Sequence, residues 1–105
     1  MPFLDAEEAW FWFMRAQMAR ADGARGTADM NEKTRPCDPD DIYRAVIDLA
    51  RRHVIGPRHL KTLASFGVLG WPPDQRLAEQ QCQARLWDES MDRLTTVLKK
   101  KDIIL

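Results

Sequence analysis

Hydrophobic residues are most concentrated near the start of the chain, where five large apolar side chains follow one another over residues 10–14. We expect a helix here, because Asp5 and Glu8 resemble an acidic capping box and Asp22-Gly23 is a typical helix end. The pattern therefore predicts a helix over about 6–22 that forms the interior of the domain. At about 100° per residue, its core arc of about 140° holds Trp10, Phe13, Met14 and Met18.

Trp12 falls on the opposite side of this helix, beside Ala16 and Ala19. Charged residues interrupt the apolar run well short of the roughly 18 apolar residues that a membrane span requires, so protein must cover this side. The cover is the long loop, the C-terminal tail or a second molecule. We expect the apolar tail at 103–105 to dock onto the domain, and Trp12 is one of the positions that it could cover.

Residues 39–67 are typical of two helices separated by a break. Asp38 is placed to cap the first helix, and Pro39 occupies its first position. Gly56-Pro57 interrupts the helical pattern, because proline restricts the residue before it and lacks a backbone donor. Gly67 is expected to end the second helix.

A long C-terminal helix is expected over about 75–100, capped by Asp74. Between the first and second helices, residues 23–37 are polar and glycine-containing, which predicts a long flexible loop. Period-2 alternation and internal repeats are absent from the sequence. The chain is therefore expected to form one all-α domain over residues 1–105, with two long and two short helices. The core stripe of the last helix would be Trp87, Met91, Leu94 and Leu98.

Charge and cysteine content exclude several classes of protein. The sixteen basic and sixteen acidic residues cancel, so nucleic acid or an acidic membrane could be bound only locally. Cys37 and Cys82 form no C-x-x-C pair and follow no secretory leader, so we expect free thiols and a cytoplasmic location. Cys37 precedes a helix N-terminus, where a thiolate is favoured, and is the more plausible reactive cysteine.

The sequence offers little support for catalysis. His53 and His59 are not spaced to share one helical face, so no metal site is expected. The aspartates at 38, 40 and 41 are explained by helix capping. Phosphate-binding glycine loops, nucleophile motifs and apolar carboxylate pairs are absent. We therefore expect no enzyme, no cofactor and no small-molecule ligand.

The helical pattern in the middle of the chain indicates a function. The helix-break-helix at 39–67 is similar in pattern to helix-turn-helix DNA readers, whose second helix presents basic and amide side chains to the groove. Leu63 to Val68 is similar to the alanine-then-glycine turn of that motif, with one residue fewer between alanine and glycine. The second helix would direct Arg58, His59, Lys61, Thr62 and Ser65 outward. Alternatively, the last helix offers Gln80, Gln81, Gln83, Arg85 and Arg93.

Two functions remain open at this point. The first is a small regulatory protein that binds DNA, for which the candidate residues are Arg44, Arg51, Arg52, Arg58, His59 and Lys61. The second is a protein-interaction module or homodimer that uses the exposed side of the first helix. Its candidate residues are Trp12, Ala16 and Ala19, because exposed tryptophan is a frequent interface anchor.

Overall fold

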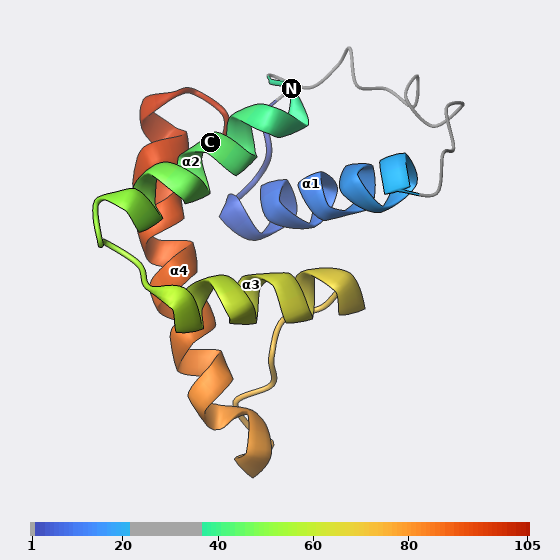
Figure 1. The fold of residues 1–105 in the computed structure, drawn as a ribbon, viewed down its shortest axis with the longest axis vertical. Helices are drawn as coiled ribbons and strands as arrows, with labels where there is room; N and C mark the ends of the chain where they lie inside the picture. Colours follow the sequence, from blue (N-terminus) through green and yellow to red (C-terminus); the bar gives the residue numbers. More distant parts are fainter. Residues whose placement is uncertain (1, 22–36) are drawn as a thin grey trace.

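The computed structural model describes residues 2–21 and 37–105, and it has the predicted small all-α fold. The described chain contains four α-helices and one short 3-10 helix (Figure 1). The flexible loop predicted at 23–37 lies outside the described residues except for Cys37, as does the glycine cap at Asp22-Gly23. The elements are α1 (Ala6–Ala21), α2 (Pro39–Arg51), α3 (Pro57–Leu69), η3 (Ala78–Gln80) and α4 (Gln81–Lys100).

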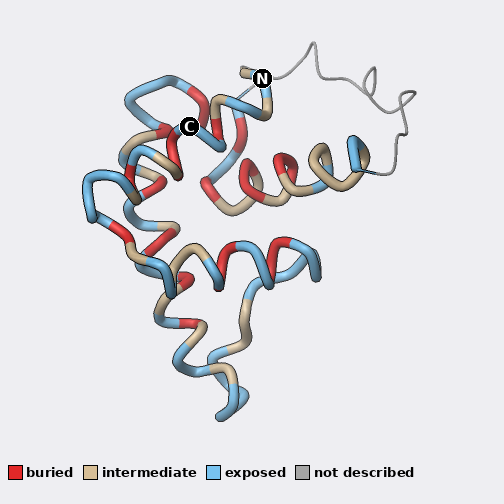
Figure 2. Tube along the Cα trace, in the orientation of Figure 1, coloured by how far each residue is buried: buried red, intermediate tan, exposed pale blue. Residues whose placement is uncertain are grey.

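Helix α1 forms the interior of the domain, as the aromatic run predicts. The backbone N–H of Glu8 donates to Oδ1 of Asp5 at 2.8 Å, and the Glu8 carboxylate accepts from the backbone N–H of Leu4 at 2.7 Å. This reciprocal pair caps the first turn. Trp10 and Phe13 are buried, while Met14 is partly buried against them. Figure 2 shows that the buried positions of α1 lie in its first half, and they include Trp10 and Trp12 on opposite sides, as expected for a helix covered on more than one side.

Both ends of the chain cover the far side of α1. Phe3 is fully buried, and its ring centroid lies 5.1 Å from that of Trp12. The Phe3 backbone pairs with the tail, since its N–H donates to the carbonyl of Ile103 and its carbonyl accepts from Leu105, both at 3.0 Å. Docking of the tail is therefore confirmed. Trp12 is only 7% exposed, so the chain itself supplies the cover.

Gly67 does not end α3, contrary to the sequence-based prediction. The helix continues to Leu69 and ends at Gly70, whose φ of 89° is the left-handed conformation of a glycine cap. Gly67 is instead buried against α1. A Cβ atom at this position would lie 2.7 Å from Cγ of Met14 and 3.0 Å from Nε1 of Trp10. Glycine is thus required for the close approach of two helices.

Helix α4 begins later than predicted, because Asp74 stabilises a turn instead of capping the helix. Its carboxylate accepts hydrogen bonds from the backbone and guanidinium of Arg76 at 2.9 and 3.1 Å. These bonds hold the pKa of Asp74 below its ordinary value. The chain then forms η3 and enters α4 at Gln81. Within α4, the core stripe is confirmed for Trp87, Leu94 and Leu98, which are buried, while Met91 is partly buried.

Trp87 connects the last helix to the first and third. Its ring is fully buried, stacks on Phe11 at 5.5 Å and meets Phe66 edge-on at 6.4 Å. Its indole N–H donates to Oε2 of Glu7 at 2.9 Å. A buried indole normally needs such a partner, because an unpaired N–H costs free energy. Glu7 therefore has two roles: its negative charge stabilises the first turn of α1, and its carboxylate accepts the hydrogen bond of the buried Trp87 indole.

Candidate functional site

The predicted helix-break-helix is present, but its helices are arranged differently from those of DNA readers. α2 and α3 are joined by residues 52–56, within which His53 has a positive φ of 60°. α2 packs on α1 and α4, and α3 packs on α4 and α1, whereas α2 and α3 contact each other little. The second helix of the motif is therefore held by α4 rather than by the first helix.

The side chains at the start of α3 are directed toward α4. His59 accepts from the backbone N–H of Gly56 at 3.0 Å through Nδ1, which caps the helix, and its Nε2 lies 2.8 Å from Oε1 of Glu89. With Nδ1 as acceptor, the neutral ring carries its proton on Nε2 and donates to that carboxylate. His59 is therefore a structural link between two helices and not a free contact residue, contrary to its place among the DNA-binding candidates.

Two other predicted outward residues of α3 have internal partners. Thr62 is buried, and its hydroxyl donates to the carbonyl of Arg58 at 2.9 Å, so the prediction that it faces outward is wrong. Arg58 is exposed, and its guanidinium lies 3.1 Å from Sγ of Cys82 on α4. Lys61 and Ser65 are exposed as predicted.

The three arginines of the predicted site on or just after α2 are exposed, but two of them are paired with acids. Arg44 lies 3.5 Å from Asp41, and Arg52 lies 3.1 Å from Asp48. Such exposed pairs contribute little to stability, but they reduce the local positive charge. Arg51 has no ion-pair partner among the described residues.

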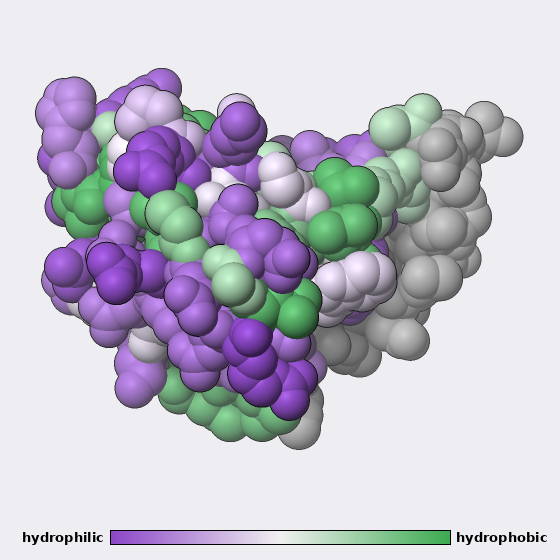
Figure 3. Space-filling view, turned by 90° about the horizontal axis from the view of Figure 1, so that it is seen from below, coloured by the Kyte–Doolittle hydropathy of each residue, from purple (hydrophilic) through white to green (hydrophobic). Residues whose placement is uncertain are grey.

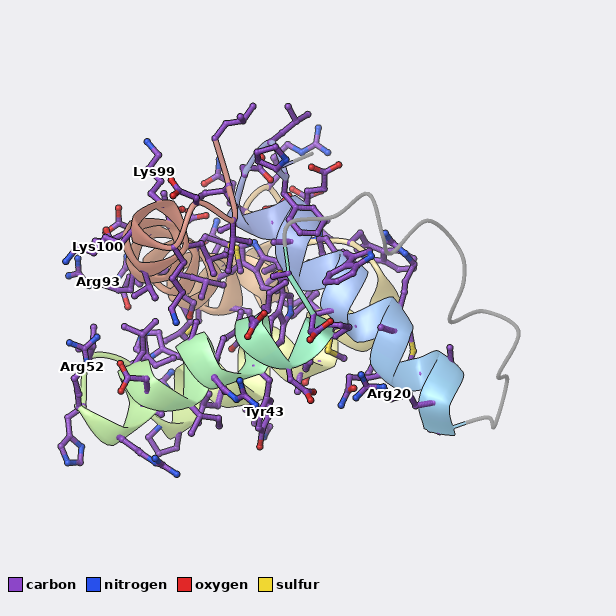
Figure 4. All side chains as sticks on the ribbon, turned by 90° about the horizontal axis from the view of Figure 1, so that it is seen from above. Arg20, Tyr43, Arg52, Arg93, Lys99 and Lys100 are labelled. Atoms are coloured by element: carbon purple, nitrogen blue, oxygen red, sulfur yellow. The ribbon has the colours of Figure 1, made fainter. Side chains whose placement is uncertain are left out.

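A second group of cations gathers with Arg52. Figure 4 shows Arg52 on the same side of the molecule as Arg93, Lys99 and Lys100 of α4. We call these four residues the basic flank. All four are exposed. Arg52 forms an ion pair with Asp48, and Arg93 forms one with Asp92 at 3.0 Å. The two lysines therefore give the flank its excess positive charge.

Sequence reasoning found only part of this flank. Arg52 belongs to the predicted site and Arg93 to the alternative on the last helix. The lysines were assigned only to the favourable C-terminal end of the helix dipole. The run of lysines at 99–101 was the available signal, but its position beside α2 follows from the packing of α2 on α4.

The side of α1 predicted to bind a partner is largely covered by the chain itself. Trp12 is buried under Phe3, so the prediction of an exposed tryptophan anchor is wrong. Ala16 and Ala19 are partly buried. The physical reason is that the chain termini pair with each other across this side, which helical periodicity within α1 does not encode.

The surroundings of Cys37 do not favour the reactive thiolate that its position before a helix predicts. Partial burial, together with the negative charges of Asp41 and Asp38, raises the pKa of its thiol from 9.0 to about 11. The carboxylates that cap α2 thus oppose the thiolate that the helix N-terminus would favour. Cys82 is exposed.

Within residues 2–21 and 37–105, histidine, cysteine and carboxylate side chains form no cluster placed to hold a metal ion. In the same described part of the chain, each helix is too short or too polar to cross a bilayer.

Comparisons of the chain with protein-family models, with curated proteins and with solved structures gave no match. The structural class is thus that of a small all-α domain.

Proposed function

We propose that this protein is a small regulatory protein that binds nucleic acid through the phosphate backbone, with the basic flank as its contact surface. The observation that carries the proposal is the placement of cations from two separate helices on one side of the molecule, Arg52 beside α2 and three cations of α4 (Figure 4). Long, exposed cationic side chains are the groups that displace counterions from phosphates.

Contact with the backbone accounts for this surface better than base reading by α3. The exposed side of α3 carries Arg58 and Lys61 near its start but becomes apolar at Val68 and Leu69. A helix that reads bases needs polar side chains directed at the groove, whereas phosphate contacts need only accessible charge. The proposal therefore retains nucleic acid as partner and replaces the predicted reading helix with the flank. Two free cysteines fit a reducing compartment such as the cytoplasm.

Fluorescence anisotropy with a labelled DNA duplex at low salt tests this function. The flank variant is Lys99→Gln with Lys100→Gln, and the matched control is Arg15→Gln with Lys61→Gln, which removes the same charge from exposed positions on α1 and α3. Loss of two phosphate contacts should weaken binding about tenfold or more, while the control stays within about threefold of the wild type.

Absence of binding by the wild type at low salt would reject the function. Equal weakening by both double variants would reject the flank as the contact surface, because only overall charge would then matter.

A further inference from the structure

The surface has a hollow outside the basic flank, and acidic and aromatic side chains line it. It is open, has a volume of about 600 Å³, and lies between the start of α1, the segment 71–77 and the first half of α4. This volume is in the range of pockets that bind small ligands or a few side chains. Its lining includes Glu7, Trp71, Leu77, Ala84, Trp87 and Asp88.

Trp71 supplies an exposed aromatic wall for this hollow. Its side chain is 59% exposed, although tryptophan is a residue type that domains usually bury to a large extent. Pro72 and Pro73 follow it, and their fixed φ angles restrict the backbone that presents the indole. Leu77, at the other end of the segment, is 44% exposed. Figure 3, which views the molecule from below, shows hydrophobic residues exposed between hydrophilic ones on this face.

The charge of the hollow is negative. Three carboxylates line it, those of Glu7, Asp74 and Asp88, against the single guanidinium of Arg76. Asp74 and Arg76 bind each other through two hydrogen bonds of 3.1 Å between guanidinium and carboxylate, so they neutralise one another. The remaining charge is that of Glu7 and Asp88.

These two carboxylates have free acceptor capacity. Oε2 of Glu7 accepts from the Trp87 indole at 2.9 Å, which holds the carboxylate in place and leaves its second oxygen for another donor. Asp88 is exposed and has no hydrogen-bond or ion-pair partner among the residues that the structure describes. The hollow therefore combines an aromatic surface with two acceptors that lack a cation.

We propose that this hollow binds an arginine side chain presented by a segment of a partner protein, with apolar neighbours of that arginine resting on Leu77. The guanidinium is planar, so it stacks on the indole of Trp71 and donates to carboxylates with several N–H groups at once. Lysine fits less well, because its ammonium is a compact and strongly hydrated charge that cannot stack in this way.

The proposal does not rest on nucleic-acid binding. It uses Glu7, Trp71 and Asp88, none of which belongs to the basic flank, and its charge preference is the reverse. Failure of one proposal leaves the other unaffected.

Titration of the full chain with the capped tripeptide acetyl-Leu-Arg-Leu-amide, followed by ¹H–¹⁵N NMR, tests the inference. The reference peptide carries citrulline in place of arginine, which keeps the shape and removes the charge. We expect saturable shifts of the Trp71 indole N–H and of the backbone amides around Asp88. Affinity for the arginine peptide should exceed that for the citrulline peptide about tenfold.

Trp71→Ala and Asp88→Asn should each weaken binding of the arginine peptide about three- to tenfold. Asp40→Asn is the matched control, because it removes an exposed carboxylate on α2 outside the hollow, and it should leave affinity unchanged. Thermal unfolding of each variant verifies the fold.

Three results would overturn the proposal: equal affinity for the arginine and citrulline peptides, shifts that avoid the hollow, or equal effects of Asp88→Asn and Asp40→Asn. Shifts at the hollow that depend on protein concentration without peptide would show that a second copy of this chain occupies it.

Discussion

The indole N–H of Trp10 donates a 3.0 Å hydrogen bond to the backbone carbonyl of Leu63, one helical turn before Gly67. This bond is buried and joins α1 to α3. It depends on Gly67, because a side chain at that position would occupy the space of the indole and of Met14. The contact between the two helices is therefore determined by a glycine in the middle of a helix.

Gly67→Ala should destabilise the protein, although alanine is the better helix former. The added Cβ would lie 2.7 Å from Cγ of Met14 and 3.0 Å from the Trp10 nitrogen, so the Met14 side chain must move and the Trp10 indole must shift, which weakens its hydrogen bond to Leu63. We expect a loss of about 1–3 kcal/mol in the free energy of unfolding, measured by urea denaturation. Ser65→Ala on the exposed side of α3 serves as control. A Gly67→Ala protein as stable as the wild type would show that the helices do not approach this closely.

Phe3→Ala should open the cover over Trp12. Phe3 is fully buried and joins both chain ends to α1, so its truncation removes apolar contacts and leaves a cavity. A loss of about 3 kcal/mol or more in the free energy of unfolding is expected, with greater quenching of tryptophan fluorescence by iodide. Leu105→Ala, at an exposed position that preserves the backbone pairing, should change stability by less than about 0.5 kcal/mol. Similar effects of the two substitutions would contradict this packing.

The features that the sequence predicted correctly are those with local signals. Glu8 and Asp5 cap α1 within four residues of each other, and Asp38-Pro39 opens α2. The aromatic run had to be covered on several sides, because no single apolar stripe contains both Trp10 and Trp12. Each of these inferences needs only neighbours along the chain.

The features that were missed depend on partners distant in the sequence. In a sequence, glycine can indicate either the end of a helix or a close contact between two helices. Gly67 serves the close contact, because Trp10 of α1 packs against it. For Trp12, docking of the tail was predicted, but its direct contact with Phe3, which itself pairs with Ile104, was not. The basic flank could not be assembled from periodicity, since it needs the relative placement of α2 and α4.

Cys37 should react slowly with iodoacetamide at pH 8. Since its pKa of about 11 exceeds the ordinary value of 9.0, the thiolate population at pH 8 is about a hundredth of that of an ordinary thiol. Mass spectrometry should find Cys82 alkylated first and Cys37 only as the pH approaches 11. Faster labelling of Cys37 than of Cys82 would contradict this environment.

The same shift has a consequence for stability. The thiol of Cys37 has a higher pKa in the folded state, about 11, than the ordinary value of 9.0 that it has in the unfolded chain. Its contribution to the free energy of unfolding is therefore fully present below pH 9 and is lost as the pH rises from about 9 to about 11. Cys37→Ser should reduce this alkaline loss, measured as the change in unfolding midpoint between pH 8 and pH 10.5.

His59→Ala should destabilise the domain by about 1–2 kcal/mol, because it removes the cap on the Gly56 N–H and the bond to Glu89. Lys61→Ala on the same helix is the control and should have little effect. In ¹⁵N NMR spectra of the neutral ring, the proton should reside on Nε2. A proton on Nδ1 would contradict the capping geometry.

The most direct test of the proposed function is the salt dependence of DNA binding. With the two flank lysines, which are unpaired within the described part of the chain, on phosphates, a plot of log binding constant against log salt concentration should have a slope of about −1.8, and Lys99→Gln with Lys100→Gln should bring it close to zero. A slope that is the same in the wild type and in this double variant would contradict the assignment of the flank as the surface that binds nucleic acid.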